Sequence, residues 1–387
     1  MIIIKNANLI SMEDINYNVC DILVEGKLIK EIGEIDPKKY PEALVIDAQG
    51  RYVTPGLVDP HCHVGMIEST IGWAGSDANE ATSPVTPELR AIDGIKPHDE
   101  CFKEALDSGV TTVCTGPGSA NLIGGTFCAL KTKGDTVDEM ILVEELCMKM
   151  ALGENPKRVY GNSKTTPQTR MASAAIMREW LFKAKAYHEK KQAYLNNKEE
   201  NKEPEFNMKL ESLSRVFDGF PVKIHAHQAD DIATAVRIGK EFNLNMTVDH
   251  ATEGYLITDF LKANNQPVII GPVLGSKSKY ELKNKSFISG KVLSESGVDF
   301  AIMTDHPVVE QKHTLIHVAL FVKEGLDELQ ALKAVTINAA RLCHIDQFVG
   351  SIKEGKHADI VVWNKHPLDI MAKPDYVLLN GQVEVEK

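Results

Sequence analysis

Eight short apolar segments alternate with stretches of helical periodicity through the middle of the chain. Short buried runs separated by helical stretches are typical of βα units that form a parallel sheet. The alternation extends over about 290 residues, within the usual size of a (β/α)8 barrel. The third segment, TFCALKT, could equally be one half of a hairpin. The expected strands span residues 56–63, 110–116, 126–132, 146–153, 221–227, 245–250, 267–271 and 299–306.

The two ends of the chain have a different pattern. Residues 1–53 contain short β-rich runs separated by Gly, Asn and Asp, and the same pattern returns in residues 350–387. We therefore expect the two ends to combine into one small β-sandwich domain, and residues 54–349 to form the α/β barrel. A charged helical insertion interrupts the barrel at about residues 154–216. It is either a solvated segment or a lid, because insertions after barrel strands lie on the catalytic face.

Composition limits the possible partners. The formal net charge is −11, which argues against a surface for nucleic acid or anionic membranes. No apolar stretch reaches the length of a membrane span, and the N-terminus lacks the features of a signal peptide. Seven cysteines without a C-x-x-C pair suit a reducing cytosol. We expect a cytoplasmic protein that acts on a small molecule.

Ligand-type side chains stand at the ends of four expected strands. Because side chains alternate along a strand, His61 and His63 face one way and Cys62 faces the other. An H-x-H pair alone is weak evidence, but the four strand ends together indicate a metal site at the barrel mouth. Several histidines with one aspartate suit a metal such as zinc. The other three ends carry His225, His227 and Gln228; Asp249 and His250; and Asp305 and His306.

Three features together resemble the metal-dependent amidohydrolase superfamily, in its imidazolonepropionase-like and prolidase-like branch. They are the string PGLVDPHCHVG at residues 55–65, the split β domain, and GSIKEGKHADIVVW at residues 350–363. The resemblance implies that His250 binds a second metal ion or polarises the substrate carbonyl. It also implies that Asp305 is the general base toward the attacking water, so Asp305 and His250 are the expected catalytic residues. The metal ligands that it implies are His61, His63, His225 and Asp305.

The number of metal ions is open at this point. Binuclear members of the superfamily bridge two ions with a carboxylated lysine at the end of strand four, and here that strand contains Lys149. A lysine in an apolar strand is costly unless it is neutralised or paired. Lys149 is therefore a carbamylated bridge or a side chain that reaches the barrel rim. Glu154 is the competing ligand, unless it pairs with nearby cations. We expect one or two divalent ions, zinc first, with manganese or iron as alternatives.

This site predicts hydrolysis of a carbon–nitrogen bond. A bound divalent cation lowers the pKa of its water to about 7 and polarises a carbonyl oxygen. Asp305 can take the proton and pass it to the leaving nitrogen. The expected substrates are small cyclic amides, N-acyl amino acids or dipeptides. A prolidase-like dipeptidase and an aminohydrolase (deaminase) are the alternatives with the same ligands, and a metal-free scaffold should have lost some of them.

Substrate contacts are expected from two segments. His227 faces the same way as His225, two residues nearer the mouth. Gln228 stands where imidazolonepropionases carry an acidic residue, which argues against that chemistry and, mildly, against deamination. Residues 153–170 bring Arg158, Tyr160 and Arg170 close to the end of strand four, and the arginine fork suits a carboxylate. Surface salt bridges are the alternative for each arginine. A homodimer is expected, because dimers are common among proteins that resemble this one.

Overall fold

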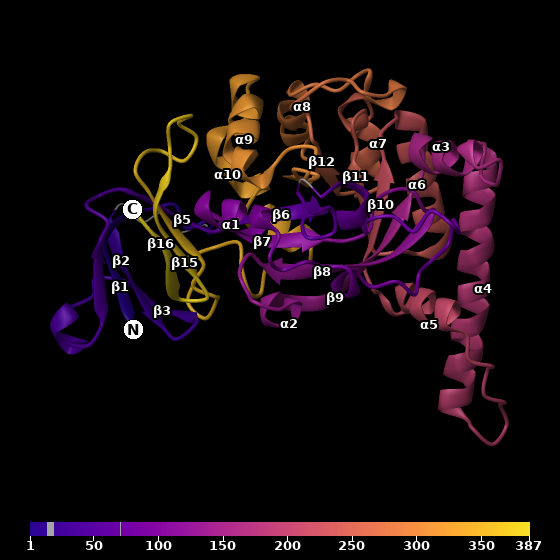
Figure 1. Ribbon diagram of the computed structural model, residues 1–387, viewed down its shortest axis with the longest axis horizontal. Helices are drawn as coiled ribbons and strands as arrows, with labels where there is room; N and C mark the ends of the chain where they lie inside the picture. The colour runs from indigo at the N-terminus through magenta and orange to yellow at the C-terminus, as the bar shows by residue number, and fades with distance from the viewer. Residues whose placement is uncertain (14–18, 70) are drawn as a thin grey trace.

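The computed structural model describes residues 1–13, 19–69 and 71–387. Over these residues the chain forms two eight-stranded sheets, one from the middle of the chain and one from its two ends. Figure 1 shows the terminal sheet, in indigo and yellow, beside the barrel. This arrangement confirms the predicted fold class, an α/β barrel with a separate β unit built from both termini.

All eight predicted barrel strands are present, and their order in the sheet follows the chain from β6 to β13. The sheet closes where the chain beyond β13 returns to β6. There the Asp305 N–H donates to the carbonyl of His61 over 3.1 Å, and the His63 N–H donates to that of His306 over 2.9 Å. The strands are β6 (Leu57–Cys62), β7 (Val110–Thr115), β8 (Ile123–Lys131), β9 (Ile141–Ala151), β10 (Val222–Ala226), β11 (Met246–His250), β12 (Val268–Ile270) and β13 (Phe300–Ile302).

Asp59 adds a second connection across this seam. Its carboxylate accepts the N–H of Thr304 over 3.3 Å and the side-chain amide of Gln311 over 3.2 Å. Burial raises the pKa of Asp59 to about 6, although these hydrogen bonds oppose the rise. The aspartate of the PGLVDPHCHVG string therefore ties the first barrel strand to the last one.

The third barrel strand differs from a regular (β/α)8 pattern. β8 pairs in the antiparallel direction with both β7 and β9. Residues 116–122 connect β7 to β8, and this is too short for the crossover of a dozen or more residues that parallel strands need. The hairpin alternative for TFCALKT is therefore the correct one.

The helices lie mainly between the later strands and cover the barrel. Helix α1 begins after Asp99, whose carboxylate accepts the Cys101 N–H over 3.2 Å, and α4 begins after Thr169, whose hydroxyl accepts the Ala172 N–H over 3.0 Å. The helices are α1 (Glu100–Asp107), α2 (Val137–Met140), α3 (Glu154–Asn162), α4 (Arg170–Asn196), α5 (Met208–Ser214), α6 (Ala229–Phe242), α7 (Thr258–Ala263), α8 (Ile288–Ser296), α9 (Thr314–Lys323), α10 (Glu328–Ala334) and α11 (Ile337–Leu342).

Residues 154–216 contain α3, α4 and α5. The long helix α4 projects beyond the barrel at its far end, as Figure 1 shows. It buries Met177, Leu181 and Ala184 and contacts α5 and α6. Helix α3 lies at the opposite end of α4, where β9 ends. The insertion thus brings one short helix to the barrel mouth, and the long helix α4 packs on α6 before it extends past the barrel.

In the terminal sheet, the two halves of β1 pair with different strands. Residues Ile2–Lys5 pair with β2 and β4, whereas Asn8 and Leu9 pair with β5. Apolar side chains from both halves of the sheet form one buried cluster, as expected of a sandwich. We propose residues 1–53 with 350–387 as the extent of this domain. Its strands are β1 (Ile2–Leu9), β2 (Cys20–Glu25), β3 (Leu28–Gly33), β4 (Leu44–Asp47), β5 (Tyr52–Pro55), β14 (Ile360–Trp363), β15 (Pro374–Leu379) and β16 (Gln382–Glu386).

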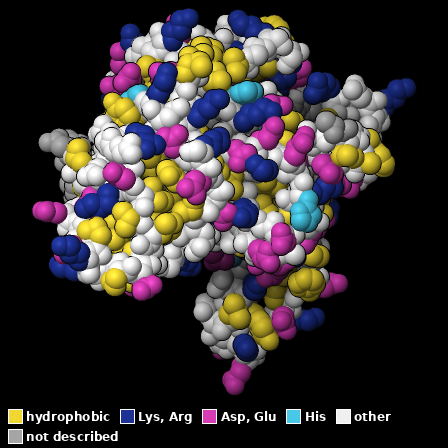
Figure 2. All heavy atoms as spheres, turned by 60° about the vertical axis from the view of Figure 1, so that its left-hand side comes forward, with side chains coloured by type: hydrophobic (Ala, Val, Ile, Leu, Met, Phe, Trp, Pro, Cys, Tyr) yellow, Lys and Arg dark blue, Asp and Glu magenta, His cyan; other side chains and the backbone are white. Residues whose placement is uncertain are grey.

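The surface carries charges of both signs. On the face shown in Figure 2, Lys and Arg side chains are interspersed with Asp and Glu side chains. Among the residues that the structure describes, no helix has both the length and the apolar composition needed to cross a membrane.

Candidate active site

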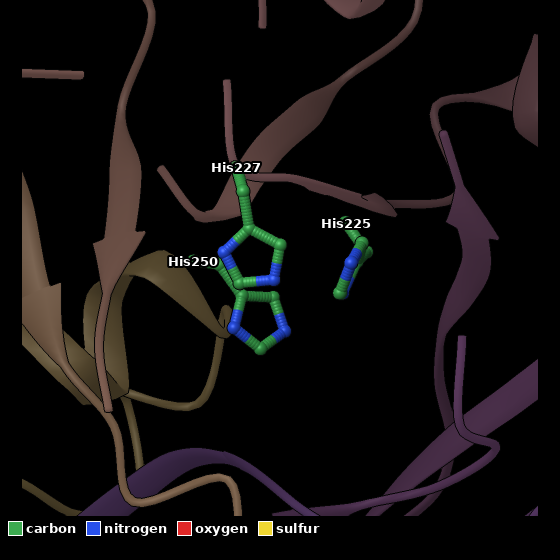
Figure 3. A group of neighbouring side chains, drawn as sticks. All are labelled: His225, His227 and His250. Atoms are coloured by element: carbon green, nitrogen blue, oxygen red, sulfur yellow. The ribbon is translucent and has the colours of Figure 1, made fainter. Parts of the chain in front are cut away.

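The side chains predicted at the strand ends meet at one end of the barrel. His61, His63 and Asp305 form one group, and His225, His227 and His250 form another. Within each group the ligand atoms lie within 4.8 Å of one another. The groups adjoin, because the ring centroids of His61 and His250 are 5.4 Å apart. Figure 3 shows the second group, in which the ring of His250 lies 4.2 Å from that of His225 and 4.5 Å from that of His227.

Left-handed backbone occurs at the strand ends that carry these groups. His250, Ala251 and Asp305 have φ values of 73°, 39° and 52°. This conformation is costly for residues other than glycine, and such strain is concentrated at functional sites. Hydrogen bonds hold the strained segments, from the Ala251 N–H to Ala226 O and from the Asp305 N–H to His61 O. The strained backbone positions therefore coincide with the points where His250 and Asp305 enter the site.

Each of the five histidines uses Nδ1 in a hydrogen bond to an oxygen atom. Carboxylate and carbonyl oxygens only accept, so Nδ1 carries the proton in His61, His63 and His250, and the lone pair of each ring is on Nε2. The partners are Asp249 Oδ2 for His61 (2.6 Å), Gly116 O for His63 (2.7 Å), Ser119 Oγ for His225 (2.8 Å), Thr252 Oγ1 for His227 (2.7 Å) and Gly271 O for His250 (2.9 Å).

The Nε2 atoms of the second group are buried but unpaired. Among the described residues, Nε2 of His225, His227 and His250 has no hydrogen-bond partner. Buried polar atoms without a partner are rare in native proteins and call for an explanation. Imidazoles whose Nδ1 is fixed and whose Nε2 is free are the usual form of histidine ligands. The group therefore fits a metal ion.

Distances in the first group fit a metal ion as well. Asp305 Oδ1 lies 3.3 Å from His63 Nε2 and 3.7 Å from His61 Nε2. Two ligand atoms bound tetrahedrally to one zinc ion are about 3.4 Å apart, given metal–ligand distances of about 2.1 Å. Nitrogen and carboxylate ligands suit zinc, and also manganese or iron.

The protonation states of these groups favour cation binding. Burial lowers the pKa of His61, His225 and His250 well below the usual value. The positive charge of Lys149 adds to the effect for His61 and His225. These imidazoles are neutral near pH 7. For Asp305, burial alone would raise the pKa, but His250, His63 and Lys149 outweigh it, so that the pKa is lowered and the carboxylate is ionised.

Lys149 adjoins the first group from β9. Its Nζ lies 3.1 Å from His61 Nε2 and 5.1 Å from the centre of the Phe127 ring. The side chain is fully buried and does not reach the barrel rim. Burial lowers the pKa of Lys149 to about 8, although Asp249 and Asp305 oppose the change. Glu154 belongs to neither ligand group, and its backbone N–H donates to Glu281 Oε2 over 3.0 Å.

A cavity of about 570 Å³ opens over the two ligand groups. Its lining includes His63, His225, His250 and Asp305, together with two of the five predicted substrate contacts, His227 and Arg158. The predicted binding segment at 153–170 therefore reaches the cavity through Arg158.

The other three predicted substrate contacts lie outside the cavity lining. The Tyr160 hydroxyl donates to Asn121 Oδ1 over 2.5 Å. Arg170 donates to Asp231 over 2.8 and 3.0 Å and to Gln228 Oε1 over 2.6 Å, which ties the start of α4 to the start of α6. The polar atoms of Tyr160, Gln228 and Arg170 are therefore bonded to other protein groups. Substrate binding by these three residues stays a prediction.

Asp249 and Ser119 hold two of the histidines in place. From the sequence, neither residue is assigned a role of its own. Asp249 holds His61, and Ser119, in the loop after β7, holds His225. A carboxylate beside His250 in an apolar strand was a usable signal for Asp249. Ser119 lies in a glycine-rich loop that matches no functional pattern.

Glu281 and Lys279 are two further polar residues at the site that the sequence did not predict. Glu281 is fully buried, and its Oε1 lies 3.5 Å from His227 Nε2 and 3.9 Å from His225 Nε2. Lys279 Nζ lies 2.6 Å from the same oxygen. Both residues follow β12 in a polar stretch without periodicity, which offers no signal from sequence alone. A carboxylate thus approaches His225 and His227 at the end of β10, although residue 228 is an amide.

A barrel with two groups of histidine and aspartate side chains at its mouth, beside a split β domain, is the arrangement expected of a metal-dependent hydrolase. Residues 52–387 match the family model described as Amidohydrolase family, and the chain belongs to this family. The chain is therefore an enzyme that hydrolyses carbon–nitrogen bonds, and its family depends on metal ions.

Individual relatives agree with this assignment. The chain is 31% identical over 394 residues to amidohydrolase tasK of Hapsidospora irregularis, with 95% of this chain but 40% of that protein covered. It is 24% identical over 402 residues to an imidazolonepropionase of Treponema denticola, covering 95% and 92% of the two chains. A solved amidohydrolase from Thermotoga maritima superposes with a TM-score of 0.95 at 38% identity, and both chains are covered completely.

Proposed function

We propose that this protein hydrolyses a small cyclic amide, an N-acyl amino acid or a dipeptide at the barrel mouth. The observation that carries the proposal is the pair of buried ligand groups beneath one cavity, the second of which has three unpaired Nε2 atoms. His61, His63 and Asp305 would hold one divalent cation, with zinc as the first candidate. His225 and His250 would hold a second, and a carbamylated Lys149 would bridge the two. When bound, such a cation polarises a carbonyl oxygen and lowers the pKa of a water molecule to about 7.

Asp305 is the proposed general base. It is ionised, it lines the cavity, and it can accept the proton of the attacking water and return it to the leaving nitrogen. Water attacks the carbonyl carbon, the C–N bond breaks, and the nitrogen leaves with the proton. This route needs no covalent intermediate with the protein.

The hydrogen bonding of His250 favours one of its two expected roles. Its Nδ1–H donates to Gly271 O, and burial keeps the ring neutral. The free Nε2 lone pair can bind a cation, but it cannot donate a hydrogen bond to a carbonyl. We therefore propose that His250 acts as a metal ligand and contributes to catalysis through the ion.

A prolidase-like dipeptidase is the second candidate. The position of Lys149, 3.1 Å from His61 Nε2 and fully buried, favours a binuclear site of the kind that the superfamily builds with a carboxylated lysine. Deamination remains the alternative chemistry with the same ligands. We also propose a homodimer and a cytoplasmic location, as expected from the sequence.

Metal removal and restoration test the proposal. The purified protein is analysed for zinc, manganese and iron, stripped with a chelator and reloaded with one metal at a time. Hydrolysis is followed on cyclic amides, N-acetyl amino acids and Xaa-Pro dipeptides at each stage. We expect activity on one of these classes to disappear with the metal and to return with zinc or manganese. Unchanged hydrolysis after complete metal removal would contradict the proposed mechanism.

A further inference from the structure

One wall of the cavity carries three basic side chains. Arg158 comes from α3, whereas Lys279 and Lys285 come from residues 272–285, which follow β12. We call these three residues the cationic wall. Within the described part of the chain, Asp305 is the one carboxylate in the cavity lining, and it belongs to a ligand group. The cavity lining thus has more basic than acidic side chains, whereas the whole protein has a net charge of −11.

The three cations belong to one continuous surface. Asn155 and Arg158 are three residues apart on α3 and therefore share a helix face, and both line the cavity. Lys279 Nζ donates to Asn155 Oδ1 over 3.2 Å, which joins the segment after β12 to this face. Lys285 Nζ donates to the carbonyls of Gly275 and Ser276, in the same segment, over 3.1 and 2.9 Å.

The positive charge of the wall is only partly balanced. Lys279 alone of the three has an ion pair among the described residues, with the buried Glu281. Lys285 uses two of its three donors on neutral carbonyls, and the guanidinium of Arg158 has five donors without a recorded partner in that part of the chain. Free donors and uncompensated charge beside a cavity are the requirements for binding an anion.

We propose that the cationic wall binds a carboxylate of the substrate, so that the enzyme prefers acidic C–N compounds, such as N-acyl amino acids and dipeptides, to neutral cyclic amides. The inference rests on the proposed function for the reaction itself. Arg158 and Lys285 supply the free donors. Lys279, whose charge is paired with Glu281, also bonds to Asn155 and so holds the segment after β12 against α3.

Binding of matched probes tests the inference on the metal-loaded full-length protein. N-acetylglycine and N-acetylglycinamide differ in the carboxylate, and their affinities are measured by calorimetry. We expect the wild type to bind N-acetylglycine more tightly, by roughly tenfold or more. Arg158→Met and Lys285→Met should each remove most of this preference, with the amide affinity unchanged. The preference should also weaken as salt is added.

Matched controls come from the same elements. Lys157→Met on α3 and Lys283→Met after β12 remove one charge each, but neither residue lines the cavity. Both controls should keep the wild-type preference. Lys279→Met would leave the buried Glu281 without its cation. This variant is therefore compared with a double variant that carries both Lys279→Met and Glu281→Gln. Thermal unfolding verifies that each variant is folded.

The outcomes separate this inference from the proposed function. Equal affinity of the wild type for both probes overturns the inference. It is equally overturned if Arg158→Met and Lys285→Met leave the carboxylate preference intact, because the metal ions alone would then bind the acid. If no amide is hydrolysed but the preference depends on Arg158 and Lys285, the proposed function fails and the carboxylate site stands.

Discussion

The Nδ1–H of His61 donates a hydrogen bond to Oδ2 of Asp249 over 2.6 Å, and both side chains are fully buried. Asp249 also accepts the Thr247 hydroxyl over 2.7 Å and lies 3.4 Å from Lys223 Nζ. A carboxylate in this position fixes the tautomer and orientation of a ligand imidazole and raises its basicity. A residue of the sixth barrel strand thus fixes the ring of a candidate metal ligand on the first strand.

Asp249→Asn should weaken metal binding by about tenfold to a hundredfold, because loss of such a carboxylate lowers ligand basicity and loosens the ring. The dissociation constant is measured by competition with a chelator, on protein shown to be folded. Asp259→Asn, an exposed change at the start of α7, is the control and should bind metal like the wild type. An Asp249→Asn affinity equal to that of the wild type would contradict the proposed role.

Lys149→Met should reduce the metal content of the fully loaded protein, because the bridging carboxylate cannot form. For the same reason, loading of the wild type should depend on bicarbonate, the source of the carbamate. Metal analysis after loading with and without bicarbonate checks both points, and intact mass under native conditions should reveal one added CO₂. Two ions per chain in Lys149→Met, or in wild type loaded without bicarbonate, would argue for a site without the bridge.

Gly116→Ala should destabilise the protein and weaken metal binding. A Cβ at this position would lie 2.1 Å from Cδ2 of Phe127, a buried ring whose centroid is 5.1 Å from that of His61. The Gly116 carbonyl also accepts the His63 Nδ1–H. We expect a loss of about 1–3 kcal/mol in the free energy of unfolding, as for other overpacked sites.

Gly124→Ala is the matched control for this change. The Cβ would meet its nearest atom, Pro117 Cβ, at 3.5 Å, an ordinary van der Waals contact. Denaturant unfolding and metal titration of the two variants, side by side, give the comparison. Equal stability of the two variants would show that the chain absorbs the clash at Phe127.

Asp21, in the terminal sheet, should make stability depend on acid pH. Burial alone would raise its pKa, but hydrogen bonds from Lys5 Nζ and from the N–H groups of Ile35 and Asn6 outweigh burial and lower it. A lowered folded-state pKa means that the stabilisation is complete above the unfolded value of about 3.9. It is lost as pH falls through the folded-state pKa.

Asp21→Asn should therefore cost about 1–3 kcal/mol of unfolding free energy at pH 7. The difference from the wild type should narrow as the pH falls below 4 and the wild-type carboxylate protonates. Urea unfolding at a series of pH values measures this difference. A gap that stays constant down to pH 2 would mean that ionisation of Asp21 adds no stability.

The barrel and the gathering of ligand-type side chains at its mouth could be predicted from the sequence because both depend on local patterns. The alternation along β6 puts His61 and His63 on one side, and parallel strands bring their carboxyl ends to the same edge. His225, His250 and Asp305 follow the same rule, and the structure brings them to adjoining groups. The antiparallel direction of β8 depends on connection length and on its neighbours, which a short apolar run does not reveal.

The substrate side was harder to predict because it depends on tertiary contacts. Arg170 has the chemistry of a carboxylate binder, but Asp231, distant in the sequence, occupies its guanidinium. Lys279 and Glu281 have no distinguishing pattern in the sequence. They become candidates only when the segment after β12 packs against α3 and against the histidines at the end of β10.

Asp305→Asn tests the central claim most directly, since it removes the proposed base and keeps an oxygen ligand of the same size. Metal content and kcat/KM are measured on the same preparations, beside Asp299→Asn, an exposed change just before β13. We predict that Asp305→Asn retains its metal and loses turnover by a factor of about 10² to 10⁴, the usual contribution of a general base. Near wild-type turnover with full metal content would show that another group accepts the proton.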